Sequence, residues 1–134
     1  MAKTFFRWVC VALVAFAISF HCAAEQKETL GSWDVHYIAF GSTFITPEIA
    51  KNYGIVRSKY NAIVNISVLD SDSQAAQHVS MTGKATNLIG TTKALTFKKV
   101  TEGDAIYYLA SLKFDNMETY RFEINIQRGN ENQT

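Results

Sequence analysis

The chain has 134 residues, with 13 lysines and arginines against 12 aspartates and glutamates, which gives a net charge of +1 at pH 7. This near-neutral balance argues against a nucleic acid partner, because such proteins carry a basic face that neutralises phosphates. The length suits a single domain with one hydrophobic core.

Residues 1–24 have the layout of a secretory signal peptide. Lys3 and Arg7 form a basic start, an apolar run covers residues 8–20, and small residues end the segment at Ala24. This order predicts export, with cleavage after Ala24. The apolar run has about 13 residues, whereas a membrane-spanning helix needs about 20, so an uncleaved anchor is the less favoured interpretation.

Removal of this segment would change both the charge and the cysteine content. Cys10 and Cys22 are the two cysteines of the sequence, and both leave with it, as do two basic residues. The remaining residues 25–134 then have eleven basic and twelve acidic residues, and the domain that we expect over residues 25–128 has no thiol for a disulfide or a metal site. We expect it to lie in the periplasm, without a transmembrane segment, and to end in a flexible polar tail over residues 129–134.

Most of the expected domain alternates between apolar and polar residues with a period of two, which is the pattern of a half-buried β-strand. In chain order, this pattern predicts strands over residues 25–30, 33–40, 61–69, 79–86, 92–100, 104–114 and 119–127. The last is the clearest case, since four apolar side chains face one way: Tyr120, Phe122, Ile124 and Ile126. Turn-forming residues such as Gly90 and Gly103 separate the strands.

Six to seven strands at this spacing predict an all-β fold, an immunoglobulin/fibronectin-like antiparallel β-sandwich with one short helix in a crossover loop. An open or closed β-barrel is the alternative. The stretch GDAIYY resembles the tyrosine corner of immunoglobulin-type domains and favours the sandwich, although the cysteine of those domains is absent.

One helix interrupts the strands, between Thr46 and Gly54. Thr46 suits the N-cap, where its hydroxyl accepts a hydrogen bond from a free backbone N–H, and Pro47 suits the first helical position. Gly54 suits the left-handed conformation that ends a helix. Two turns are too short to be stable alone, so we expect Ile49 and Tyr53 to dock on the sheets.

The position of this helix in a crossover allows two roles. The simpler role is a plug that covers one open end of the sandwich. The other role is a rigid platform that presents four side chains to a binding partner: Tyr53, Arg57, Lys59 and Tyr60. We treat these four as the candidate binding residues.

Several phrases of the sequence resemble a known family. They are STFITPEIAKNYGIVRSK, NISVL, VTEGDAIYYL and FDNMETYRFEI, in this order. They resemble small secreted gammaproteobacterial proteins that are catalogued only as domain of unknown function 4426. The resemblance implies a bacterial, periplasmic, signal-bearing protein of this size and supplies no activity, cofactor or catalytic residue. It also implies a further strand after the last one expected here, whereas this chain ends in NENQT.

The sequence offers little for catalysis or metal binding. Asp34 and His36 share one face of a predicted strand, but two ligands do not make a closed metal site. Ser42 follows a glycine without the G-x-S-x-G pattern of a nucleophile elbow, and Glu102 and Asp104 flank a turn glycine. We therefore assign no catalytic, metal or cofactor-binding residue.

The strand over residues 104–114 gives the best indication of binding. Both of its faces are largely apolar, one through Ile106 and Tyr108 and the other through Tyr107 and Leu109. Such a strand is either central and covered, or it presents a patch to a partner. We therefore expect a non-enzymatic binding or accessory module whose partner is another periplasmic or envelope protein.

Two alternatives stay open. A small periplasmic hydrolase or carbohydrate-active enzyme would use carboxylates or Ser42, and it would show a deep pocket with converging Asp, Glu or His side chains. A carrier for a lipid or another small ligand would require a hollow interior.

Overall fold

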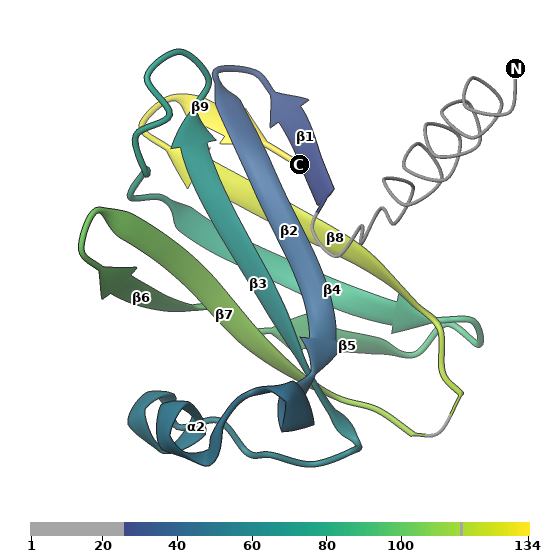
Figure 1. The fold of residues 1–134 in the computed structure, drawn as a ribbon. Coiled ribbons are helices and arrows are strands. Elements are labelled where there is room, and N and C mark those ends of the chain that lie inside the picture. The colour runs from purple at the N-terminus through teal and green to yellow at the C-terminus, as the bar shows by residue number, and fades with distance from the viewer. Residues whose placement is uncertain (1–25, 116) are drawn as a thin grey trace, which may run out of the picture.

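Two antiparallel sheets pack face to face in the computed structural model, which describes residues 26–115 and 117–134 (Figure 1). The first sheet has five strands in the order β1 (Gln26–Leu30), β2 (Trp33–Gly41), β3 (Asn61–Asp70), β7 (Ala105–Lys113) and β6 (Lys98–Glu102). The second sheet has four in the order β5 (Thr92–Leu95), β4 (Ser80–Asn87), β8 (Tyr120–Arg128) and β9 (Glu131–Gln133). The predicted β-sandwich is therefore confirmed, with more strands than the six or seven expected.

The described residues begin with β1, which confirms the edge strand expected at the start of the domain. The expected signal peptide over residues 1–24 and its cleavage after Ala24 lie outside the described residues. Among the residues that are described, no helix has the length and apolar character needed to cross a membrane.

The core lies between the sheets and follows the alternation of the sequence. On the central strand β3, Val64, Ile66 and Val68 are buried and point toward the second sheet, where they meet Ile126 of β8. A second buried cluster joins the two sheets further along, with these members: Ala85, Leu95, Ala110 and Leu112. Full burial of one such aliphatic side chain stabilises the fold by about 1.5–3 kcal/mol, so these clusters hold the sheets together.

The single strand expected over residues 92–100 is two strands in different sheets. Residues of β5 pair with β4, whereas residues of β6 pair with β7. Phe97 lies at the crossing and packs against both buried clusters. An alternating pattern does not reveal such a crossing, because each half is a β-strand whichever sheet it joins.

Residues 129–134 were expected to form a flexible tail, and this expectation is wrong. Gly129 adopts a left-handed backbone with a φ of 58°, which turns the chain back on itself. Glu131–Gln133 then pairs with the end of β8 as β9. The Glu131 carboxylate also accepts hydrogen bonds from the backbone N–H and the hydroxyl of Ser32, at 3.0 and 2.6 Å. An edge strand can be held by such backbone and polar contacts without apolar side chains. The polar composition of residues 129–134 therefore did not indicate that they form a strand.

The helix in the crossover is confirmed as α2 (Pro47–Tyr53), after a 3₁₀ turn, η1 (Ser42–Phe44). The Thr46 hydroxyl accepts a hydrogen bond from the backbone N–H of Ile49 at 3.4 Å, and Gly54 ends the helix with a φ of 66°. The docking expected of Ile49 is wrong, since its side chain is 46% exposed, whereas Ala50 is buried. The helix lies at one end of the sandwich, near β6 (Figure 1), where the Tyr53 hydroxyl bonds to Glu102.

Candidate functional site

An apolar cleft of about 310 Å³ opens between the two sheets, on the side where β1 and β9 are the edge strands. Strands β1, β2 and β3 line it from one sheet and β8 lines it from the other. Its walls are mainly apolar, through side chains that include Leu30, Tyr37, Ala39, Ile66, Phe122 and Ile124. Figure 1 shows β8 of the second sheet crossing behind β2 of the first.

The cleft exists because burial falls off along the inward face of each bordering strand. On β2, Val35 is 6% exposed and Tyr37, two residues further on the same face, is 37% exposed. On β8, Ile126 is 1% exposed and Phe122 is 38% exposed. Along this side of the sandwich, β2 and β8 are therefore in close contact at one end and diverge toward the other, which leaves inward-facing aromatic side chains uncovered, whereas the second buried cluster keeps the sheets joined further in.

The strand edges beside the cleft are incomplete. Strand β1 pairs with residues Trp33–Tyr37 of β2, and β9 pairs with residues Ile126–Arg128 of β8. No strand within the described part of the chain pairs with the same edge of β2 over residues 38–41, or of β8 over residues 120–125. Both unpaired stretches contribute side chains to the cleft, so its mouth is bordered by backbone without a strand partner.

Few polar groups face the cleft. Glu28 of β1 and Thr134 are on its rim. The Tyr37 hydroxyl donates a hydrogen bond to the Gln26 side chain at 3.0 Å, and the Asn125 amide donates one to the Thr134 hydroxyl at 3.1 Å. In the described ranges no three His, Cys, Asp or Glu side chains are grouped in a way that could hold a metal ion. The cleft is therefore suited to apolar groups, with polar contacts only at its rim.

Asp34 and Ser42, which the sequence analysis weighed for catalysis, do not come together. They lie at opposite ends of β2, eight residues apart along an extended strand, which places them roughly 25 Å from each other. The buried Ser42 hydroxyl donates to the backbone carbonyl of Ser58 at 3.0 Å and accepts from the N–H of Ser58 at 2.9 Å. Both of its hydrogen bonds therefore hold the crossover against the end of β2.

The hydrogen bonds of the Asp34 carboxylate also hold parts of the fold together. It accepts hydrogen bonds from the Gln74 amide at 2.9 Å and the Thr29 hydroxyl at 2.8 Å, and the Lys27 ammonium lies 3.9 Å away. These hydrogen bonds, with that of Gln74 the strongest influence, hold the pKa of Asp34 below its ordinary value. The charged carboxylate thus ties β1 to the loop that follows β3.

The four candidate binding residues of the crossover fall into two pairs. The Tyr53 hydroxyl bonds to Glu102, which raises the pKa of Tyr53, and the Arg57 guanidinium donates to the carbonyls of Ile45 and Thr43 at 2.7 and 3.1 Å. The Lys59 ammonium lies 5.0 Å from the centroid of the Tyr60 ring, and both side chains are exposed. Tyr53 and Arg57 hold the crossover in place, and a binding partner for the four residues stays a prediction.

No residue of the cleft was predicted to be a site residue from the sequence. Phe122 was placed on the apolar face of a predicted strand, and Tyr37 and Ala39 lie on one face of the strand predicted over residues 33–40, as the core residue Val35 does. Local signals could not separate the two groups, because the same alternation produces a buried face and a cleft wall.

Comparison with known proteins gives a family and a fold. The family model for the domain of unknown function DUF4426 matches residues 27–134. A crystal structure of a DUF4426 family protein from Pseudomonas aeruginosa PAO1 is 32% identical in sequence, with a TM-score of 0.72 over 85% of this chain and 90% of that chain. No curated protein matches the chain significantly.

Proposed function

We propose that this chain, which belongs to the DUF4426 family, is a non-enzymatic binding module that takes up an apolar group in the cleft between its sheets. We further propose that it works in the periplasm. The supporting observation for export is the basic, apolar and small-residue order of residues 1–24.

The observation that carries the binding role is the uncovered inward face of the cleft. Tyr37 and Phe122 belong to the faces that form the core elsewhere, yet more than a third of each side chain is exposed. Covering apolar surface is worth about 25 cal/mol per Å², so an apolar group that fills the cleft gains free energy from side chains already in place. A volume of about 310 Å³ is at the lower end of the range for small-ligand sites.

A direct test measures the binding of an uncharged apolar fluorophore, N-phenyl-1-naphthylamine, by fluorescence titration. Ala39→Phe adds a ring to the wall of the cleft, and we expect it to weaken binding about tenfold or more, which is about 1.4 kcal/mol. Thr82→Phe adds the same ring to the exposed outer face of β4, away from the cleft, and should leave binding unchanged.

Equal binding by the wild type and Ala39→Phe would contradict the proposal, because the probe would then bind elsewhere. Circular dichroism and thermal unfolding of both variants show that each is folded before the titrations are compared. Fractionation of cells that express the full chain tests the compartment, and recovery in the cytoplasm would contradict export.

A further inference from the structure

We propose that the cleft receives an extended segment of another polypeptide, which adds as a strand to the free edge of β8 and places alternate apolar side chains between the sheets. This inference rests on the proposed function, since it names the class of molecule that the cleft binds. It is drawn from the pairing of β8, the direction of its side chains and the charge beside it.

The first observation is that β8 lacks a partner along most of one edge. Strand β4 pairs with β8 from Gln127 to Tyr120 on one side. On the other side β9 pairs with three residues only, Ile126–Arg128. In an antiparallel ladder every second residue directs its N–H and C=O toward a given edge, so residues 120–125 offer a row of backbone donors and acceptors there.

The second observation is that this free edge borders the cleft. Phe122 and Ile124 line the cleft, and cross-strand neighbours in a sheet point to the same face. A strand added beside them would extend the line of β9, and every second side chain would enter the space between the sheets. One occupant would therefore satisfy the backbone edge and fill the cleft together.

The third observation is the sequence of the free edge itself. The stretch YRFEIN is rich in residues that favour strands and contains no proline. Its pairing with β4 is interrupted neither by a bulge nor by an inward-facing charge. Natural edges that must stay unpaired are usually blocked by such features. This edge is therefore competent to accept a strand. An acyl chain or another small apolar molecule would fill the cleft but leave the backbone groups of the edge unpaired.

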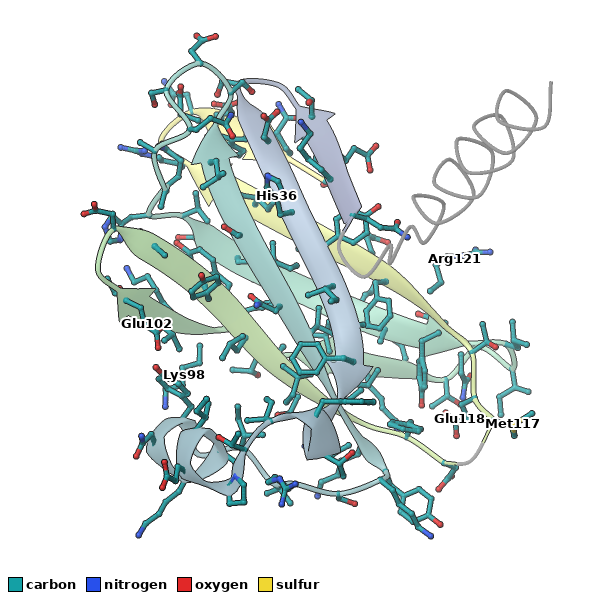
Figure 2. All side chains as sticks on the ribbon, viewed as in Figure 1. His36, Lys98, Glu102, Met117, Glu118 and Arg121 are labelled. Atoms are coloured by element: carbon teal, nitrogen blue, oxygen red, sulfur yellow. The ribbon has the colours of Figure 1, made fainter. Side chains whose placement is uncertain are left out.

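The charge beside the edge indicates the polar residues of the occupant. Arg121 points to the outer face of β8, projects away from the ribbon (Figure 2), and makes no hydrogen bond or ion pair with any described residue. Glu123, two residues further, lies 3.6 Å from the Lys84 ammonium. We therefore expect an occupant with apolar residues at alternate positions and an acidic residue beside Arg121, since opposite charges on neighbouring strands stabilise pairing.

The test uses a capped synthetic peptide of eight residues, with isoleucine or valine at alternate positions and aspartate or threonine between them. Two control peptides have the same side chains but carry N-methyl groups, one on the amides of the apolar residues and one on the amides of the polar residues. In a paired strand only one of these sets of amides faces β8. We expect isothermal titration to show that one control loses at least tenfold in affinity and the other binds about as well as the parent.

The outcomes separate this inference from the proposed function. If all three peptides bind equally, or if none binds while N-phenyl-1-naphthylamine does, the cleft binds apolar groups without strand addition and the inference is wrong. If neither the peptides nor the fluorophore bind, both the inference of strand addition and the proposed function are wrong. Light scattering that shows a dimer dissociated by the parent peptide would identify a second copy of this chain as the occupant, and would overturn a partner of different sequence.

Two further measurements locate the strand. Within residues 120–125, hydrogen exchange of the alternate amides that face the free edge should slow by at least tenfold when the parent peptide binds, and unchanged exchange at these amides would contradict the pairing with β8. Arg121→Gln should weaken a peptide that has aspartate beside it, and should have less effect on the same peptide with threonine at that position. Thr82→Phe, on the outer face of β4, is the matched control.

Discussion

The hydroxyl of Tyr108, on the buried face of β7, accepts a hydrogen bond from the backbone N–H of Val79 at 2.8 Å and donates one to the carbonyl of Gln77 at 2.9 Å. Residues 77–79 lead into β4, so one side chain of the first sheet fixes the entry to the second. This contact sets the position of β4 and, through the β4–β8 ladder, that of the cleft wall.

Tyr108→Phe should therefore lower the free energy of unfolding. It leaves a partly buried N–H and a carbonyl without their partner, which costs about 1–3 kcal/mol. Urea denaturation measures the change, and Tyr107→Phe, on the opposite face of the same strand, is the control with an expected change within about 0.5 kcal/mol. Equal effects of the two variants would show that the hydrogen bonds of Tyr108 contribute nothing.

The same residue predicts a loss of stability in alkali. Burial raises the pKa of Tyr108 above its ordinary value of about 10, so the folded protein keeps the phenol proton at a pH where the unfolded chain has lost it. The resulting stability is full below pH 10 and falls as pH rises from there through the folded pKa. The decline between pH 9 and 11 should be smaller in Tyr108→Phe than in the wild type, and parallel curves would contradict this assignment.

Asp34 predicts a loss of stability in acid. The hydrogen bond from Gln74, with help from Thr29 and Lys27, keeps its folded pKa below the unfolded value, so the charged carboxylate stabilises the fold above about pH 4. This contribution is lost as pH falls through the unfolded and then the folded pKa. Thermal unfolding at pH 7 should show Asp34→Asn to be less stable than the wild type, and the difference should shrink toward pH 2. A difference that does not depend on pH would contradict a role for the charge.

Gly83 of β4 faces the inner side of the sandwich, close to the cleft wall. A Cβ at this position would lie 2.7 Å from Cδ1 of Ile124 and 3.1 Å from the Phe97 ring. Gly83→Ala should force Ile124 to move and cost about 1 kcal/mol or more. Ile124→Val removes the clashing methyl group, so the double variant should be more stable than the sum of the single effects predicts, and additive effects would contradict the contact.

Arg57 and Lys59 should separate the two possible roles of the crossover. The guanidinium of Arg57 holds two loop carbonyls, so Arg57→Ala should speed hydrogen exchange over residues 43–58 and lower the free energy of unfolding by about 1–2 kcal/mol. Lys59→Ala should change stability by less than about 0.5 kcal/mol, because its side chain is exposed. Neither variant should alter binding of the apolar fluorophore, and a loss of binding would link the crossover to the cleft.

The helix α2 was predictable almost to the residue. Thr46, Pro47 and Gly54 act on the backbone within one turn, so their effect does not depend on what the helix packs against. Its docking was not predictable, because Ile49 and Ala50 both lie on the apolar side and only the position of the sheets buries one and exposes the other.

The two errors in the strands have a similar cause. The crossing at Phe97 and the order of β9 are set by which strand each segment meets, and β9 pairs next to Ser32, about a hundred residues earlier in the chain. The four candidate residues of the crossover, in contrast, were chosen for their chemistry. Tyr53 and Arg57 make contacts within their own chain, and binding of a partner by the four residues stays a prediction.

By itself, the sequence determined the elements of this protein: alternation specified the strands, and caps and turn residues specified where the helix begins and ends. These signals act over a few neighbouring residues, so they can be recognised in the sequence without knowledge of the tertiary structure. Only the tertiary structure decided that Val35 is buried in the core and that Tyr37 stays exposed in the cleft, although both lie on one face of one strand. Val35 and Tyr37 differ in exposure because β2 and β8 diverge along the cleft. These two strands are far apart in the sequence, so no local sequence pattern predicts the distance between them.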